Sequence, residues 1–527
     1  MTAKQKLEQT LWDIANTLRG KMAADDFRDY ILGFIFYKYL SEKMELYADE
    51  VLHPDKLLYT QVKEDTTEGK EYLKAVRDLS LDQLGYFLKP SELFGAMVAR
   101  GNAEGKARFI LDDLTAVLNS ISDSTRGTES EEDFANLFED LDLTSSKLGK
   151  STEDKNALVV KVLAHLNAVD FELRNDNEHK ADVLGEAYEY LIGQFASGAG
   201  KKAGEFYTPK EVSMVLARIV TTGKKRLRDV YDPTCGSGSL LLRVRHEVLD
   251  VGQLFGQESN PATFNLCRMN MIMHDVHYRR FDIKNEDTLE RPQHMDLRFE
   301  AVVANPPFSA HWKADTLKTN DERFGAYGKL APTTKADFAF VQHMVHQLAD
   351  DGTMACVLPH GVLFRGAAEG HIRKYLIEDR NYLDAVIGLP GAIFYGTSIP
   401  TCILVLKKNR GPGSEAGANI LFIDASQHFE KIKTQNKLRT EDIDKIISTY
   451  RERKTEVKYS YVAPLSEVRA NDYNLNIPRY VDTFEAEDAV DLNAVATELQ
   501  ALENGMKETD AVIAKYCKEL GIEMPFK

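Results

Sequence analysis

Short apolar runs alternate with helical stretches through the middle of the chain. The predicted strands are residues 228–231, 253–258, 299–304, 353–359, 383–389 and 402–407, and the helices among them include 239–249, 261–274, 337–348 and 370–378. A further helix is predicted at 210–220, begun by Pro209 with Thr208 as its N-cap. Such alternation predicts an α/β domain whose mostly parallel sheet has helices on both faces. Ligands of such sheets bind at the carboxyl ends of the strands.

Helical periodicity dominates both flanks of this region. Leu7, Leu11 and Ile14 recur at steps of three and four residues, and the run 30–46 is apolar enough for a buried helix. Residues 491–520 contain a second apolar stripe, which packs either on its own domain or on a partner helix. We predict three parts: a helical N-terminal domain (1–166), a sheet domain (167–480) and a helical C-terminal tail (481–527).

The length of 527 residues exceeds the roughly 250–300 at which a single hydrophobic core stops growing. The first residues are polar, without the apolar core of a secretory signal, and no apolar run approaches the roughly 18–20 residues of a membrane span. The five cysteines show no paired or His-spaced pattern, which favours reduced thiols. We therefore expect several domains, a cytoplasmic location, no membrane contact and no metal.

The charge balance limits how this chain can bind nucleic acid. Its formal net charge is −16, whereas nonspecific DNA binding rests mainly on Lys and Arg that neutralise phosphates. If the chain acts on DNA, a local basic surface or a partner subunit must supply much of the binding. The acidic segment 123–142 is predicted to be solvated loop and helix surface, with a docking surface for a basic partner as the alternative.

The loop at 232–238, Asp-Pro-Thr-Cys-Gly-Ser-Gly, joins a predicted strand to a predicted helix. Its glycines let the backbone turn tightly and approach a ligand, and the helix N-terminus offers free N–H groups. The loop lacks the P-loop pattern, and the absence of G-x-G-x-x-G weakens a nicotinamide site. Glu258 ends the next strand, where an acid holds ribose hydroxyls in doubly wound folds. The alternative is a helix-capping turn beside a surface acid.

The quartet Asn305, Pro306, Pro307 and Phe308 directly follows another predicted strand. Prolines stiffen the backbone and lack N–H donors, which leaves carbonyl oxygens as acceptors. The Asn305 side-chain oxygen and the Pro306 carbonyl can hold both hydrogens of an amino group, and Phe308 can stack on a planar base, as sites for extruded nucleobases do. The alternative is a rigid loop after a strand. The following segment, 309–335, is predicted to be a substrate-contacting or partly disordered loop.

Five motifs occur in one order along the chain: GEFYTP at 204–209, DPTCGSGS at 232–239, GQE at 256–258, EDTL at 286–289 and NPPF at 305–308. With them the chain resembles the modification (methyltransferase, M) subunit of type I restriction-modification systems, in the gamma group of amino-methyltransferases that methylate N6 of adenine in DNA. The resemblance extends over nearly the whole chain, including NLNIPRY at 474–480. It implies a Rossmann-like S-adenosylmethionine-dependent methyltransferase sheet with an all-helical N-terminal domain and a helical C-terminal tail.

The resemblance also implies roles for individual residues, with S-adenosylmethionine as cofactor and no metal. Asn305 and Pro306 would bind the target amino group, and Phe308 would stack on the flipped adenine, with Pro307 between them. The implied cofactor contacts are Phe206, Thr208 and Pro209 around the cofactor, Asp232, Gly236 and Gly238 at its methionine end, Glu258 at its ribose and Asp287 at its adenine, with Glu205, Tyr207, Lys210, Ser237 and Ser239 completing the set.

The partners that the resemblance implies are double-stranded DNA, a specificity (S) subunit that selects the target, a second copy of the M subunit in a complex of two M subunits with one S subunit, and a restriction (R) translocase-nuclease subunit. Two other hypotheses remain. A self-sufficient adenine methyltransferase would read DNA through 309–335 or the C-terminal third, but no basic, aromatic-rich reading domain is evident. A catalytically silent scaffold is disfavoured by the intact Asn305 and Phe308.

Overall fold

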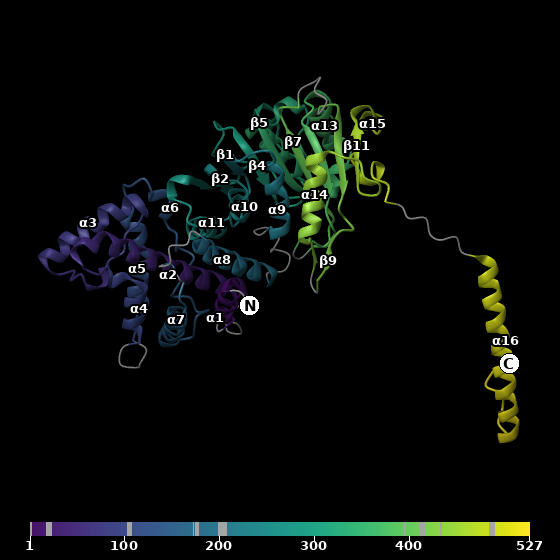
Figure 1. The fold of residues 1–527 in the computed structure, drawn as a ribbon, viewed down its shortest axis with the longest axis horizontal. Coiled ribbons are helices and arrows are strands. Elements are labelled where there is room, and N and C mark those ends of the chain that lie inside the picture. Colours follow the sequence, from purple (N-terminus) through teal and green to yellow (C-terminus); the bar gives the residue numbers. More distant parts are fainter. Residues whose placement is uncertain are drawn as a thin grey trace. The chain divides into compact units, whose positions relative to one another are not determined.

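The computed structural model describes residues 3–16, 24–102, 108–171, 173, 179–198, 208–394, 397–410, 417–432, 435–483 and 491–526. The chain forms two compact units, Met1–Val481 and Asp482–Lys527. The first unit contains a helical region and a sheet region (Figure 1). Within the described residues, no helix combines the length and apolar composition needed to cross a membrane.

Helices make up the N-terminal region. They are α1 (Ala3–Asn16), α2 (Ala24–Leu52), α3 (Thr67–Gln83), α4 (Phe94–Gly101), α5 (Leu111–Ser124), α6 (Glu131–Phe134) and α7 (Thr152–Asn167). The apolar run predicted at 30–46 lies inside α2, and its middle is buried on all sides, from Phe34 to Leu40. A helix that is apolar all round must be enclosed by others, which explains the central place of α2.

A nine-stranded sheet forms the second half of this unit. Its strands are β1 (Arg226–Asp232), β2 (Asp250–Glu258), β3 (Phe281–Asn285), β4 (Phe299–Ala304), β5 (Leu348–Pro359), β6 (Leu383–Gly388), β7 (Thr401–Lys407), β8 (Asn419–Asp424) and β11 (Ser460–Pro464), in the order β11-β8-β6-β7-β5-β4-β1-β2-β3. The strands from β3 to β5 are parallel, as are β6 and β8, whereas β7 runs antiparallel to both neighbours and β11 antiparallel to β8. A small hairpin pairs β9 (Glu430–Lys431) with β10 (Asn436–Lys437).

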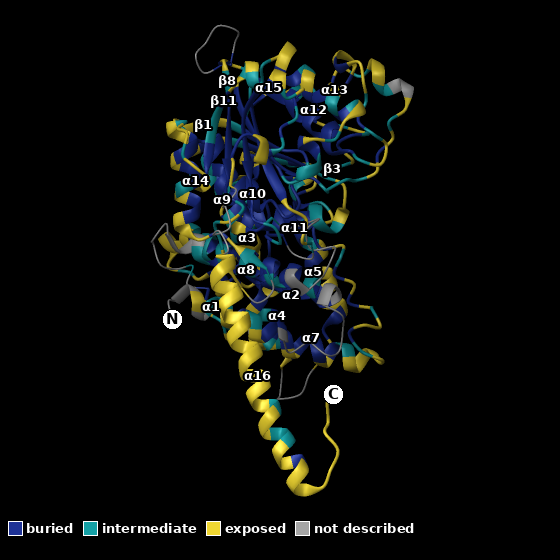
Figure 2. Ribbon diagram, turned by 90° about the vertical axis from the view of Figure 1, so that its right-hand side faces the viewer, coloured by how far each residue is buried: buried dark blue, intermediate teal, exposed yellow. Residues whose placement is uncertain are grey.

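Helices cover both faces of this sheet. They are α9 (Lys210–Val220), α10 (Ser239–His246), α11 (Pro261–Met273), α12 (Asp337–Gln347), α13 (Ala367–Lys374), α14 (Thr440–Glu452) and α15 (Leu465–Ala470), whereas α8 (His179–Gly198) packs on α1, α2 and α11. Along β4, Ala301 and Val303 belong to the core shared with α9, α10 and α11, whereas Val302 and Ala304 belong to the core shared with α12 and α13. Figure 2 shows these strands buried between the two layers. The predicted α/β class is therefore confirmed.

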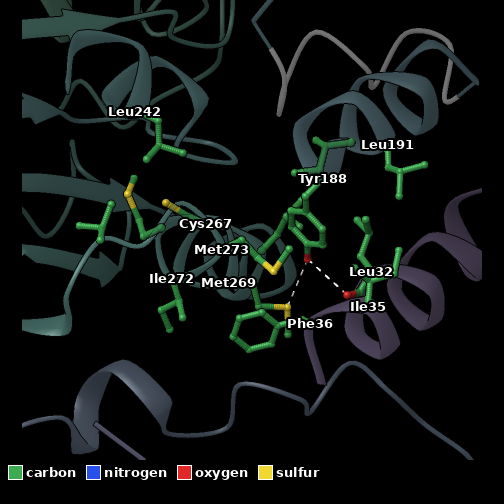
Figure 3. Packing of buried hydrophobic residues seen from close by; sticks show 14 of the residues in the cluster. Leu32, Ile35, Phe36, Tyr188, Leu191, Leu242, Cys267, Met269, Ile272 and Met273 are labelled. Carbon is green, nitrogen blue, oxygen red and sulfur yellow. Dashed lines mark hydrogen bonds between the residues drawn. The ribbon is translucent and has the colours of Figure 1, made fainter. Parts of the chain in front are cut away.

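The helical region packs directly on the sheet region through α2, α8 and α11. The hydroxyl of Tyr188 on α8 lies between the Leu32 carbonyl of α2 and the sulfur of Met269 on α11 (Figure 3). The space between α8 and α11 is tight, because a Cβ at Gly185 would lie 2.7 Å from the His274 ring.

The acidic segment 123–142 was predicted to be solvated surface. In the structure, part of it contacts the sheet region. Arg268 of α11 donates hydrogen bonds to the carbonyls of Glu132 and Ala135, at 2.7 and 3.0 Å. Lys284 of β3 pairs with the Glu132 carboxylate at 2.6 Å. The basic partner of this segment is therefore part of the same chain.

The second unit contains one described helix, α16 (Leu492–Leu520), which Asp491 caps by accepting hydrogen bonds from Asn493 and Ala494. A single helix has no neighbour inside its own unit on which an apolar stripe can pack. The predicted helical tail is thus present. The domain boundaries at 166 and 480 stay a prediction.

Candidate active site

The loop after β1 has the geometry that its glycines predict. Gly236 and Gly238 have positive φ angles of 54° and 78°, which favour glycine. A Cβ at Gly238 would also lie 2.6 Å from the Met271 side chain and 2.8 Å from Cys267. The N–H of Gly236 donates to a carboxylate oxygen of Glu258 at 3.1 Å. The glycine loop and the acid that ends β2 therefore form one structure.

Two carboxylates at this loop have raised pKa values. Asp232 is buried, and burial raises the pKa of its carboxyl to about 7, although the Thr234 N–H donates to it at 2.9 Å. Burial likewise raises the pKa of Glu258. Carboxylates held in this way are stabilised by a ligand that brings positive charge or hydroxyl donors, and such perturbed groups mark functional sites.

A cavity of about 570 Å³ opens at the carboxyl ends of these strands. Its volume falls in the range of roughly 300–1,000 Å³ that is typical of small-molecule sites. Among the predicted site residues, Glu258, Asp287 and Pro307 line it. Other lining residues come from the glycine loop (Pro233, Thr234), from the segment after β2 (Ser259, Asn260) and from the segment after β4 (His311, Trp312).

Asp287 lies on a short turn that is fixed to the glycine loop. Its carboxylate accepts hydrogen bonds from the N–H groups of Leu289 and Glu290, at 2.8 and 3.1 Å. The hydroxyl of the neighbouring Thr288 donates to the Pro233 carbonyl at 2.5 Å. This hydrogen bond therefore joins the turn that carries Asp287 to the glycine loop.

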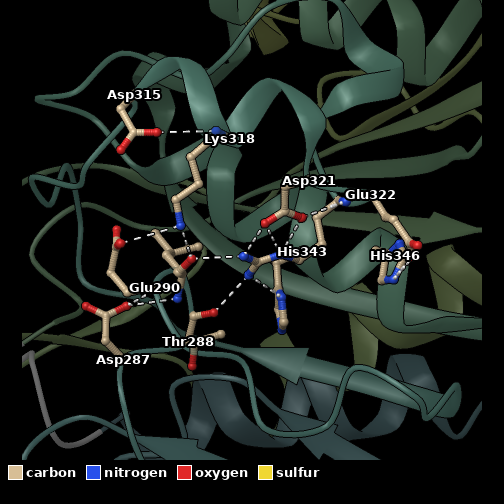
Figure 4. A network of polar contacts seen from close by, with 11 residues as sticks. Asp287, Thr288, Glu290, Asp315, Lys318, Asp321, Glu322, His343 and His346 are labelled. Carbon is tan, nitrogen blue, oxygen red and sulfur yellow. Dashed lines mark hydrogen bonds and ion pairs between the residues drawn. The ribbon is translucent and has the colours of Figure 1, made fainter.

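A buried arginine holds this turn from the other side. Arg323 is 2% exposed and donates to the carbonyls of Thr288 and Leu289, each at 2.9 Å. It also pairs with Asp321 at 2.7 Å. Figure 4 labels Asp287, Thr288, Asp321 and His343 among the residues of this network.

The network reaches β1 through His343. A guanidinium can only donate, so Nδ1 of His343, 3.2 Å from Arg323, accepts, and Nε2 carries the proton toward the Tyr231 hydroxyl at 3.0 Å. Burial, followed by the charge of Arg323, holds the His343 pKa well below its usual value. The segment 309–335 is therefore not a disordered insertion, because its Arg323 and Phe324 are core residues.

The quartet directly follows β4. Nδ2 of Asn305 donates to the Thr208 hydroxyl at 3.1 Å, whereas its buried Oδ1 has no hydrogen-bond partner among the described residues. A buried acceptor left open in this way is suited to a ligand N–H. The prediction that Thr208 caps α9 is wrong, since Pro209 holds the N-cap position without a side-chain bond and the Thr208 hydroxyl contacts Asn305 instead.

Phe308 lies edge-on to Phe394, with ring centroids 5.5 Å apart and ring planes at 84°. Pro306 is buried, and Pro307 is half-buried. Two aromatic rings therefore lie together at the end of the quartet, where only Phe308 was predicted. Phe394 stands far along the chain in a segment without a recognisable pattern.

Three further predicted residues have contacts of their own. The Ser237 and Ser239 hydroxyls are 3.0 Å apart, and Lys210 forms an ion pair with Glu186 of α8 at 3.3 Å. Glu205, Phe206 and Tyr207 lie outside the described residues.

Comparison with protein families gives the class of enzyme, the adenine-N6 DNA methyltransferases. A model of the N-6 DNA methylase family matches residues 179–489, more than half of the chain. A second model, the HsdM N-terminal domain, matches residues 7–166.

Individual relatives narrow the class. The type I restriction enzyme MpnII methylase subunit of Mycoplasma pneumoniae is 36% identical, over 98% of this chain and 96% of its own length. The type I restriction enzyme MjaVII methylase subunit of Methanocaldococcus jannaschii is 31% identical, over 94% and 83%. The crystal structure of the type I restriction-modification system methyltransferase subunit from Streptococcus thermophilus is 42% identical, with a TM-score of 0.83, and covers 92% of this chain and 100% of that chain. The chain belongs to the methylase (M) subunits of type I restriction-modification enzymes, which confirms the resemblance seen in its motifs.

Proposed function

We propose that this M subunit transfers a methyl group from S-adenosylmethionine to N6 of an adenine flipped out of DNA, at sites that a separate S subunit selects. The open Oδ1 of Asn305 is the observation on which the proposal rests. It offers a buried acceptor to an amino N–H at the carboxyl end of β4, where ligands of such sheets bind.

The chemistry follows from the acceptors of the quartet. The lone pair of an aromatic amino nitrogen is delocalised into the ring, which makes the nitrogen a poor nucleophile. Asn305 Oδ1 and the Pro306 carbonyl, by accepting its two hydrogens, favour the geometry in which the lone pair points out of the ring plane. Phe308, supported at its edge by Phe394, would stack on the base, as aromatic residues do in base-flipping enzymes.

The residues around the cavity fit the proposed cofactor. S-adenosylmethionine supplies an electrophilic methyl group when bound. Glu258 would accept hydrogen bonds from its ribose hydroxyls, and Asp287 lines the same cavity for its adenine. Asp232 would face its ammonium group, which offsets the cost of a buried carboxylate with a pKa of about 7. Direct transfer to nitrogen requires no metal from the protein.

Two features support the proposed partners: the net charge of the chain and the C-terminal helix α16. A net charge of −16 favours an S subunit as the source of much of the DNA binding, and the apolar stripe of α16 is suited to contact that subunit. A second M subunit and an R subunit would complete the assembly. A solved structure described as the type I restriction-modification system's complex assembly shares the fold, with a TM-score of 0.62 at 18% identity. The cytoplasmic location stays a prediction.

Two alternatives have less support. A self-sufficient enzyme would read DNA through 309–335 or the C-terminal third. Arg323 and Phe324 of the first segment are core residues, and Arg323 donates to the turn that carries Asp287. A silent scaffold has no use for an open acceptor at Asn305.

Transfer of labelled methyl groups to DNA, with and without the co-expressed S subunit, tests the proposal. We expect sequence-specific incorporation with the S subunit and little by the isolated chain. Robust sequence-specific methylation by the chain alone would overturn the subunit part of the proposal, and no incorporation under either condition would overturn the activity.

A further inference from the structure

The residue that follows the quartet has an unfavourable backbone conformation. Ser309 has φ of 52°, in the left-handed region that side chains other than glycine rarely adopt. Because Ser309 directly follows Phe308, its backbone angles set the direction in which the chain leaves the quartet. A conformation of this kind persists only where its surroundings hold it.

Asp337, the first residue of α12, holds Ser309 in this conformation. Its Oδ1 accepts the Ser309 N–H at 2.8 Å, and the side chain is 1% exposed. Next to this contact, the N–H of Ala336 donates to the Ala310 carbonyl at 2.9 Å. The start of α12 therefore holds the two residues that follow the quartet.

An arginine orients this carboxylate. Nη2 of Arg365 lies 3.2 Å from the second oxygen of Asp337, and its Nη1 lies 3.3 Å from the buried carboxylate of Glu369 on α13. Arg365 packs closely on Gly361, where a Cβ would lie 2.5 Å from Nε. Both oxygens of Asp337 thus accept a hydrogen bond, one from the Ser309 N–H and one from Arg365. The charge-assisted pair with Arg365 fixes the orientation of the carboxylate.

We propose that Asp337 is a positioning residue for methyl transfer. It acts through Ser309, holding the backbone after Phe308 so that the acceptors and the aromatic ring of the quartet meet the target base together. This role rests on the proposed function of the quartet. It concerns the target base more than the cofactor. Ala310 and Ala336 line the cavity, but its acidic residues, Glu258 and Asp287, lie on other segments, and the turn that carries Asp287 is held separately by Arg323. Loss of the Asp337 contact therefore lowers kcat and leaves cofactor affinity intact.

The isosteric substitution Asp337→Asn removes the contact without opening a cavity. An amide has one oxygen, and Arg365 can only donate, so that oxygen turns toward Arg365 and the NH2 group faces the Ser309 N–H. We expect kcat of the M–S complex to fall by about tenfold or more, a change that corresponds to about 1.4 kcal/mol. The Kd for S-adenosylmethionine should stay within about twofold.

A second substitution separates positioning from a merely structural role. Glycine adopts positive φ without a supporting contact, so Ser309→Gly in the Asp337→Asn background should restore part of kcat, by about threefold or more. Ser309→Gly alone keeps the contact with Asp337, so its kcat should exceed that of Asp337→Asn. Asp384→Asn is the matched control, because Asp384 of β6 is also a buried carboxylate paired with arginines, Arg410 and Arg453. It should lower the Tm and leave kcat unchanged.

An Asp337→Asn complex with wild-type kcat would overturn the inference, as would an equal loss of cofactor affinity or a failure of Ser309→Gly to restore activity. Asn305→Ala in the same assay distinguishes this failure from that of the proposed function. If Asn305→Ala is inactive and Asp337→Asn is normal, the quartet stands and the role of Asp337 is wrong.

Discussion

The carboxyl of Asp232 makes the stability of the folded chain depend on pH. Its carboxyl has a pKa of about 7 in the folded chain because of burial, against roughly 3.9 when unfolded. The folded state therefore binds the proton more tightly, and the stability that this contributes is fully present below about pH 4 and is lost as the pH rises through about 7.

Asp232→Asn should accordingly raise the Tm of the cofactor-free chain by more at pH 8 than at pH 5, because the native carboxyl is charged at pH 8 and neutral at pH 5, whereas the unfolded carboxyl is charged at both. The same variant should bind S-adenosylmethionine more weakly at pH 8, because the charge that faces the ammonium is gone. Calorimetric scans at both pH values check this. An equal change in Tm at pH 5 and pH 8 would show that the carboxyl titrates normally.

Arg323 should control cofactor affinity. Arg323→Met leaves the Thr288 carbonyl without its donor and removes the guanidinium donors of the Leu289 carbonyl and Asp321, and breaking a buried pair costs about 3–5 kcal/mol of stability. Because the turn that carries Asp287 loosens, the KM for S-adenosylmethionine should rise by about tenfold or more, with a smaller effect on kcat.

The matched control for this prediction is Arg298→Met. Arg298 is exposed and also donates to two carbonyls, those of Met295 and Leu297, at the start of β4. Steady-state kinetics of both variants should show a raised cofactor KM only for Arg323→Met. Equal KM values in the two variants would contradict the role of Arg323.

From the sequence alone, a hypothesis about individual residues can be formed where the chemistry is contiguous. The backbone and side-chain acceptors of Asn305 and Pro306 can be deduced because the two residues are neighbours in one motif. Arg323 and Asp337 act on groups distant in the sequence or through backbone atoms, and an isolated charged residue is indistinguishable from solvated surface until the fold buries it.

Among the elements, α8 and α11 pack tightly between the helical region and the sheet region. Gly185→Ala should lower the free energy of unfolding by about 1–3 kcal/mol, because the new Cβ would lie 2.7 Å from the His274 ring. A Cβ at Gly95 on α4 meets nothing within 4 Å. Gly95→Ala should therefore raise the free energy of unfolding by about 0.5–1 kcal/mol through helix propensity. Urea denaturation of both variants measures the difference, and a neutral Gly185→Ala would show that α8 can shift away from α11.

Element prediction fails mainly at the sheet edges. The inner strands β1, β2, β4 and β5 each contain a run of three or more consecutive buried residues and were recognisable, whereas the edge strands β3 and β11 were not. The sequence of β3, Phe-Asp-Ile-Lys-Asn, buries only Phe281 and Ile283. A short strand buried on one face and paired on one side lacks the continuous apolar run that marks an inner strand.

For the whole molecule, the second unit offers the clearest test of assembly. A chain that ends at Val481 keeps the first compact unit and should therefore melt at the same temperature as the full chain. Its Kd for the S subunit should rise by about tenfold or more, because the apolar stripe of α16 is lost. Analytical ultracentrifugation of the mixed subunits measures this, and unchanged assembly would make the tail a local packing element.

In the proposed function, the Asn305 side-chain oxygen accepts an amino hydrogen of the target adenine and thereby promotes transfer to N6. The most direct measurement is mass spectrometry of nucleosides from target DNA after incubation with the M–S complex and labelled cofactor, for the wild type and for Asn305→Ala. We predict labelled N6-methyladenine with the wild type and background levels with Asn305→Ala, whose Tm and cofactor affinity stay unchanged. Asn305→Ala that transfers at the wild-type rate, or a label found on cytosine, would contradict this account.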